Sequence, residues 1–188
     1  MSRLSLLFAT GCLLFAAGCR MHETGVTVQS LMDEEGPTSE SWSPIMHISE
    51  DGKPRLRLEA GYMARYETAD STYLVMSVLS EDSPRVRVDI FDAAGDSSAI
   101  VLSDRIMYFE REQRFVAEGD VVVQSHEDRW IYSEHLAWTE RTARIHTPGY
   151  ATIQTPTQTM SGYGLNADED LQDFSMKNAS GVVIVEDE

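Results

Sequence analysis

The feature that most constrains this sequence is a two-residue alternation of apolar and polar side chains, which recurs from Ile45 onward. Segment 85–90, RVRVDI, shows it most clearly, with valine or isoleucine at even positions and arginine or aspartate at odd positions. This period places the apolar side chains on one face of a β-strand and the polar ones on the other. The following segment 92–96, DAAGD, has the composition of a turn.

Short apolar or alternating segments continue at fairly regular spacing through the rest of the chain. We expect strands at 100–102, 106–109, 115–117, 121–123, 130–132, 136–139, 143–146, 151–154, 174–177 and 182–185. Beyond the N-terminal segment, no stretch of helical length carries a convincing apolar stripe of helical period. Many short strands without helices predict an all-β sandwich, jelly roll or barrel.

The sequence also contains an internal repeat. Residues 103–108 align with 133–138, and residues 119–123 align with 149–153 and again with 181–185. Repeated units that cannot close a core alone gain stability by stacking over a shared apolar interior. The glycine that opens each copy of the second motif is expected at a tight turn or bulge that requires positive φ.

The N-terminus has the pattern of an export signal. The almost wholly apolar stretch from Leu4 to Ala17 is too short to span a bilayer comfortably, but it fits the apolar region of a signal peptide. It ends in FAAGC, which resembles a bacterial lipobox, so we expect 1–18 to be a lipoprotein signal peptide and Cys19 the lipid anchor. An ordinary signal peptide with an incidental cysteine is the alternative, and Cys12 is a weaker second lipidation candidate.

Composition divides the remaining chain at about residue 43. Segment 19–43 is rich in Glu, Asp, Gly, Ser, Thr and Pro, so we expect the lipidated cysteine to be followed by a flexible tether. We place the folded domain at 44–188. The 31 acidic and 15 basic residues give a net charge of −16. We therefore expect no nucleic-acid partner, because phosphate binding needs a basic stripe.

Motifs that carry chemistry are missing from the sequence. No HExxH zinc motif, GxSxG elbow, GxGxxG fingerprint or phosphate-binding loop occurs, and both cysteines lie in the N-terminal 19 residues. Segment 166–177 has partial EF-hand spacing, but Leu171 replaces the required glycine and Lys177 the closing glutamate. We predict no catalytic residues, no metal and no cofactor. A glycan hydrolase with paired carboxylates remains an alternative.

Taken in order, these segments resemble the LptC family, the periplasmic component of the lipopolysaccharide export (Lpt) machinery. The resemblance covers roughly 43–185 and is carried by the lipobox, the tether, 85–95 (RVRVDIFDAAG), 117–123 (AEGDVVV), 132–138 (YSEHLAW) and 160–168 (MSGYGLNAD). It implies an open twisted β-jelly roll of the LptA/LptC-like (LptA/OstA-like) kind. The sequence departs from many members of the family, which keep an uncleaved transmembrane helix.

The resemblance also implies a function without chemistry, in which lipopolysaccharide acyl chains bind in a hydrophobic groove of the jelly roll. The groove candidates are the inward-facing apolar side chains Met76, Val78, Val86, Val88, Ile90, Ile106, Tyr108, Phe115, Val121, Val123, Ile131, Leu136, Trp138, Ile145 and Ile153. Alternation alone fits a dry core equally well, because both arrangements place apolar side chains inward.

The implied partners lie on both sides of this protein in a transport chain. Lipopolysaccharide comes from the inner-membrane ABC transporter, through the LptF/LptG periplasmic domains, and passes to LptA by strand addition. The partner-edge candidates are Val182, Val183, Ile184 and Val185, which an ordinary closing strand would explain equally well. We expect a lipid anchor at the periplasmic face of the inner membrane rather than the outer one. Another LptA/OstA-like lipoprotein, a carrier or scaffold at the outer membrane, is the alternative.

Overall fold

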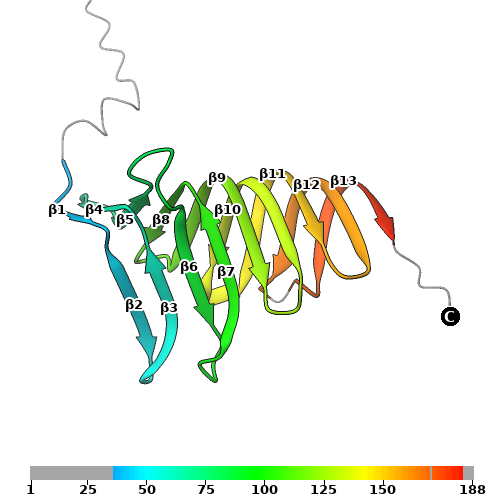
Figure 1. Ribbon diagram of the computed structural model, residues 1–188, viewed down its shortest axis with the longest axis horizontal. Helices are drawn as coiled ribbons and strands as arrows, with labels where there is room; N and C mark the ends of the chain where they lie inside the picture. The colour runs from blue at the N-terminus through cyan, green and yellow to red at the C-terminus, as the bar shows by residue number, and fades with distance from the viewer. Residues whose placement is uncertain (1–35, 170, 184–188) are drawn as a thin grey trace, which may run out of the picture. The chain divides into compact units, whose positions relative to one another are not determined.

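The computed structural model describes residues 36–169 and 171–183, which form a single unit built almost wholly of β-strands (Figure 1). The predicted all-β class is therefore confirmed. The strands are β1 (Ser39–Trp42), β2 (Ile45–Glu50), β3 (Lys53–Glu59), β4 (Tyr62–Glu67), β5 (Thr72–Ser77), β6 (Val86–Phe91), β7 (Ser97–Ser103), β8 (Arg105–Phe109), β9 (Arg114–Ser125), β10 (Trp130–Thr139), β11 (Arg144–Gln154), β12 (Gln158–Asp168) and β13 (Phe174–Val183). A short 3₁₀ turn, η2 (Glu140–Thr142), lies between β10 and β11.

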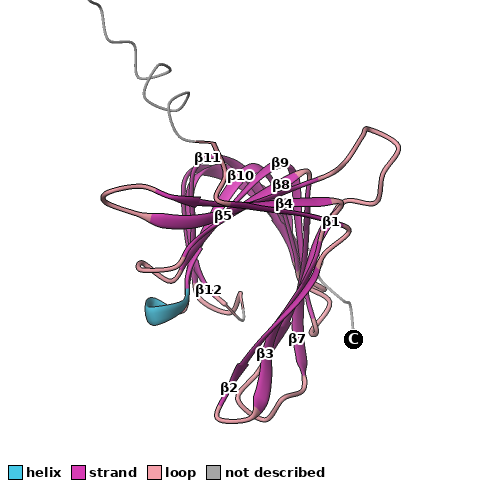
Figure 2. Cartoon of the chain, turned by 90° about the vertical axis from the view of Figure 1, so that its left-hand side faces the viewer, coloured by secondary structure: helices cyan, strands magenta, loops and turns pink. Residues whose placement is uncertain are grey.

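The 13 strands found in this part of the chain make one antiparallel sheet that divides at β9. The first half of β9 pairs with β8, and this branch continues through β5 and β4 to β1. The second half pairs with β7, and this branch continues through β6 and β3 to β2. Strands β10 to β13 follow on the other side of β9. Figure 2 shows the two branches spread apart, so the sheet is the predicted open jelly roll.

Several predicted pairs of short strands are single long strands in the structure. Strand β9 joins 115–117 to 121–123, and β10 joins 130–132 to 136–139. Strands β11 and β13 likewise join two predicted strands each. Register shifts interrupt the β9–β10, β10–β11, β11–β12 and β12–β13 ladders. The Gly and Ser residues at the joins form bends and bulges within long strands, rather than loops between short ones.

Strands β2 and β3 lie where the alternation begins, but β1, β4, β5 and β12 were not predicted as strands. Strands β4, β5 and β12 contain tyrosine, threonine, serine or glycine at many positions, so their apolar alternation is weak in the sequence. Strand β1 lies inside segment 19–43, which we had predicted to be a tether, and its four residues pair with β4. The signal peptide, Cys19 and the tether up to residue 35 lie outside the described residues.

The bend of β9 requires the first of the repeated glycines. The prediction of positive φ is wrong for the other two, Gly149 and Gly181. Gly119 has φ of +79°, and a Cβ placed on it would lie 2.6 Å from Oδ2 of Asp104. Serines at matching positions of the repeat close neighbouring bends, because Ser103 Oγ donates to the Arg105 carbonyl and Ser133 Oγ donates to the His135 carbonyl. The aligned segments of the repeat therefore contain the residues that shape these bends.

Buried side chains from β3, β5, β6 and β8 to β12 form one hydrophobic core. The most deeply buried large members are Leu56, Leu58, Met76, Ile106, Ile131, Ile153, Leu165 and Leu171. Full burial of one such side chain contributes about 1.5–3 kcal/mol, so this core accounts for much of the driving force for folding. In the part of the chain that the structure describes, no helix is both long and apolar enough to cross a bilayer.

Candidate functional site

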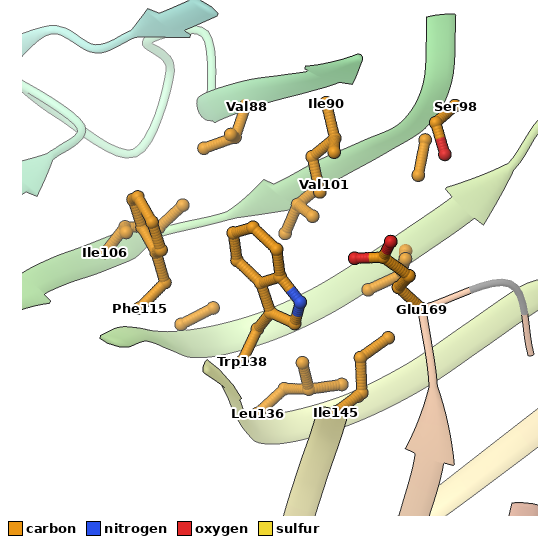
Figure 3. A pocket seen from close by; sticks show the side chains of 13 residues that line it. Val88, Ile90, Ser98, Val101, Ile106, Phe115, Leu136, Trp138, Ile145 and Glu169 are labelled. Carbon is orange, nitrogen blue, oxygen red and sulfur yellow. The ribbon is translucent and has the colours of Figure 1, made fainter. Parts of the chain in front are cut away.

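An apolar pocket opens inside the jelly roll, next to the point where the sheet divides (Figure 3). Its side chains leave a cavity of about 40 Å³, and the 590 Å³ of empty space around the lining includes open solvent. Its wall is built from β6, β7, β8, β9, β10, β11 and the end of β12. The lining residues are Val88, Ile90, Ser98, Ala99, Val101, Ile106, Phe115, Ala117, Val123, Leu136, Trp138, Ile145 and Glu169.

Side chains alternate along β6, so its apolar side chains face the pocket and its charged side chains face away from it. Val88 and Ile90 line the pocket, whereas Asp89 accepts hydrogen bonds from Arg57 at 3.1 Å and from Arg87 Nε at 2.9 Å. Burial raises the pKa of the Asp89 carboxyl, but the hydrogen bonds from the two arginines outweigh it and lower the pKa overall. The charges of β6 are thus paired on the face opposite the pocket.

Three aromatic rings run across β8, β9 and β10. Tyr108 stacks on Phe115 with ring centroids 4.3 Å apart, and Phe115 stacks on Trp138 at 5.5 Å. The three residues are cross-strand neighbours in register, which explains the contact. Burial raises the pKa of the Tyr108 phenol. Phe115 and Trp138 thereby give the pocket a rigid aromatic wall.

The groove candidates from the sequence fall into three groups. Those that line the pocket are Val88, Ile90, Ile106, Phe115, Val123, Leu136, Trp138 and Ile145. Those that belong to the core or pack against it without lining the pocket are Met76, Val86, Tyr108, Val121, Ile131 and Ile153. Val78 is half-buried just beyond the end of β5 and belongs to neither group.

Five lining residues were not among the candidates: Ser98, Ala99, Val101, Ala117 and Glu169. Ala99 and Val101 belong to β7, where Ile100 and Leu102 are equally apolar. A run without polar residues does not tell which face is inward. Val101 pairs with Val123 of β9, and this pairing turns the Val101 face of β7 toward the pocket. The pairing is a tertiary contact, so the sequence pattern does not reveal it.

The described residues contain no group of three or more His, Cys, Asp or Glu side chains placed to hold a metal ion. The acidic side chains instead pair with arginines at the surface, as in Arg65 with Glu110 and Arg85 with Asp120. The pocket lining contains one carboxylate, Glu169. The chemistry of the lining suits contact with an apolar ligand.

Strand β13 ends one side of the sheet. Among the described strands it pairs with β12 only, so its outer edge carries free backbone groups. Val182 and Val183 are 70% and 65% exposed there. The other two predicted edge residues, Ile184 and Val185, lie outside the described residues.

The opposite end of the sheet is formed by β1 and β2. Each pairs with one neighbour, β4 and β3 respectively. Trp42, Ile45 and Leu79 are exposed large apolar side chains in this region. A second hollow lies here, and its lining includes Ile45, Leu79, Arg85 and Arg87.

A family model described as "Lipopolysaccharide-assembly, LptC-related" matches residues 44–183. This span includes β2 to β13 and every residue that lines the apolar pocket. A search among curated proteins finds no match for the chain.

Proposed function

The chain belongs to the LptC-related family of lipopolysaccharide-assembly proteins, and from this premise we propose that it carries lipopolysaccharide by holding the acyl chains in its apolar pocket. Membership of this family indicates that the protein is a binding component in lipopolysaccharide transport.

The observation that carries the proposal is the chemistry of the pocket wall. Val, Ile, Leu, Ala, Phe and Trp side chains from six strands converge on one space, with Ser98 and Glu169 as the other members of the lining. Each methylene group moved from water into such surroundings contributes about 0.8 kcal/mol. Several methylenes of an acyl chain therefore outweigh a moderate repulsion between the acidic protein and the lipid phosphates.

The two open edges of the sheet support the proposal that the protein lies between two partner proteins. An open strand edge is an aggregation hazard that natural proteins normally cover, so a bare edge suits a strand-adding partner. We propose that β13 accepts LptA, and that the end formed by β1 and β2 meets the LptF/LptG periplasmic domains of the inner-membrane ABC transporter. ATP hydrolysis by that transporter supplies the energy, and this chain does no chemistry.

We further propose that acyl groups on Cys19 hold the protein at the periplasmic face of the inner membrane. Two or three acyl chains give stable anchoring where one does not. Membrane fractionation tests this placement. Recovery in the outer membrane would favour the alternative, an LptA/OstA-like carrier or scaffold. A Cys19→Ser variant should be released into the soluble periplasmic fraction.

Photocrosslinking in cells tests the lipid-binding pocket directly. A photoreactive residue replaces Val88, Val123 or Trp138, which line the pocket, and the product is blotted for lipopolysaccharide. Arg87, next to Val88 but on the opposite face, is the matched control. Adducts at the three pocket positions and none at Arg87 are expected. A folded, correctly anchored protein that gives no adduct at any pocket position would overturn the proposal in favour of a strand-adding scaffold.

A further inference from the structure

One polar atom in the apolar pocket is buried and has no partner. It is Nε1 of Trp138, an N–H donor with no hydrogen bond, on a side chain that is 7% exposed. Trp138 lines the pocket with Phe115 stacked beside it. Figure 3 shows the nitrogen edge of the ring on the side of the pocket where Ile145 and Glu169 are drawn.

An unpaired tryptophan donor in this position needs an explanation. Buried tryptophan N–H groups usually find an acceptor, and a buried donor without one is destabilising. Phenylalanine would supply the stacking surface next to Phe115 without that cost. The indole therefore adds a hydrogen-bond donor to the pocket wall, which packing alone does not require.

We propose that Trp138 Nε1–H donates to an ester or amide carbonyl oxygen of the bound acyl lipid. This inference rests on the proposed lipid-binding function and refines it. The hydrocarbon gains affinity from the apolar wall, and the donor adds a preference for carbonyl-linked chains over ether-linked ones. It also fixes the depth of the chain, because a carbonyl lies only at the head end of the hydrocarbon.

The surroundings of the donor suit a single neutral acceptor. The neighbouring lining residues Leu136, Ile145 and Phe115 are apolar, so they offer the ligand no other donor. No solvent reaches Nε1, so the ligand must part the side chains around it. Glu169 is half-buried in the lining of the pocket.

The test compares two probe lipids that differ only in the carbonyl. They are 1-myristoyl-lysophosphatidylcholine and the ether analogue with an alkyl chain of equal length, both used below their micelle concentrations with the full-length protein. We expect the wild type to bind the ester about 2–10 times more tightly, the range given by one hydrogen bond. Trp138→Phe should bind both probes equally, with the ester affinity reduced to that of the ether.

Two controls separate the donor from the hydrophobic contact. Phe115→Leu removes aromatic surface and should weaken both probes by the same factor, so the ester preference stays. Glu169→Gln should also keep the preference. An ester preference that persists in Trp138→Phe, or that is absent from the wild type while both probes bind, overturns this inference and leaves the proposed function intact. Failure of both probes to bind the wild type overturns both.

A spectroscopic measurement covers the case in which Trp138→Phe does not fold. The chain has three tryptophans. Trp42→Phe with Trp130→Phe leaves Trp138 as the one indole. Its emission should shift to longer wavelength with the ester probe, because a hydrogen bond forms at Nε1, and much less with the ether. Identical shifts with the two probes would contradict the proposal.

Discussion

Asp89 depends on its neighbours to keep its charge in a partly buried position. Its carboxylate accepts hydrogen bonds from Arg57 and Arg87, and its pKa is lowered from the ordinary value of 3.8. A carboxyl with a lowered folded-state pKa stabilises the fold above its unfolded-state pKa. This stabilisation is lost as the pH falls through the folded-state value.

We therefore expect Asp89→Asn to lower the free energy of unfolding by about 1–2 kcal/mol at neutral pH. The difference from wild type should shrink as the pH falls below the ordinary value of 3.8 and through the lower folded-state pKa, where Asp89 in the folded protein becomes neutral. Urea denaturation over a series of pH values measures this. Asp51→Asn, in the exposed turn between β2 and β3, is the control. An Asp89→Asn effect that does not change with pH would mean that packing, not charge, is lost.

Gly119 is a position where an added methyl group is expected to be costly. The residue has φ of +79°, and an added Cβ would lie 2.6 Å from Oδ2 and 2.9 Å from Cβ of Asp104. Strain in the left-handed region and overpacking together predict that Gly119→Ala lowers the free energy of unfolding by about 2–4 kcal/mol. Thermal or chemical unfolding measures the loss.

Gly36→Ala is the matched control for this substitution, because nothing lies within 4 Å of an added Cβ there and φ is not positive. It should change stability by less than about 0.5 kcal/mol. Adding Asp104→Ala to Gly119→Ala removes the 2.6 Å contact with Oδ2, so it should recover part of the loss. The 2.9 Å contact with Cβ, which alanine keeps, and the backbone strain should remain. Equal stability of Gly119→Ala and Gly36→Ala would contradict the account of the β9 bend.

At the scale of elements, alternation predicts strands well where the two faces differ in polarity. Strand β6 is the best case, since valine and isoleucine alternate with charged residues and the structure buries Val86 and Val88. Alternation fails where the buried residues are small or polar, as along β12, where Gly162 and Ala167 are buried. It also fails to tell a bend from a loop, so β9 was predicted as two strands.

The pocket was harder to predict than the fold. Sequence periodicity identifies residues that face inward. Met76 and Val88 have the same pattern and both belong to the core, but only Val88 lines the pocket. What separates them is the division of the sheet at β9, which is a tertiary pairing. The role of Glu169 could not be predicted, because it follows the end of β12 and belongs to no alternating segment.

Strand β13 is the element on which the proposed contact with LptA depends. Val182→Pro with Val183→Pro removes two backbone N–H groups at the end of the strand, where the edge is exposed. Proline cannot donate to a β-ladder, so strand addition should be lost. The free energy of unfolding should fall by no more than about 1 kcal/mol, because only the last pairs with β12 are affected. Copurification with LptA, together with urea denaturation, measures both effects.

Val182→Ala with Val183→Ala is the matched control, since it removes the side chains and keeps the N–H groups. It should retain LptA. Loss of LptA in both double variants would assign the contact to the valine side chains instead of the backbone. Retention in both would mean that LptA does not pair with this end of β13.

At the scale of the whole molecule, the charge sets how the protein meets its proposed cargo. The chain carries 31 acidic and 15 basic residues, a net charge of −16. Described arginines pair with its own carboxylates, including Arg57, Arg65, Arg85 and Arg144. The phosphates of lipopolysaccharide are therefore repelled at long range, and affinity must come from burial of the acyl chains.

This balance predicts an unusual salt dependence. The screening length falls from about 30 Å at 0.01 M to about 8 Å at 0.15 M ionic strength, so added salt removes long-range repulsion. Affinity for lipopolysaccharide should rise about threefold or more over that range, measured by quenching of tryptophan emission. The myristoyl lysolipid has a zwitterionic head group and is the control, because its affinity should change little. An affinity for lipopolysaccharide that falls with salt would point instead to a cationic contact, for which Arg85 and Arg87 beside the second hollow are the nearest candidates.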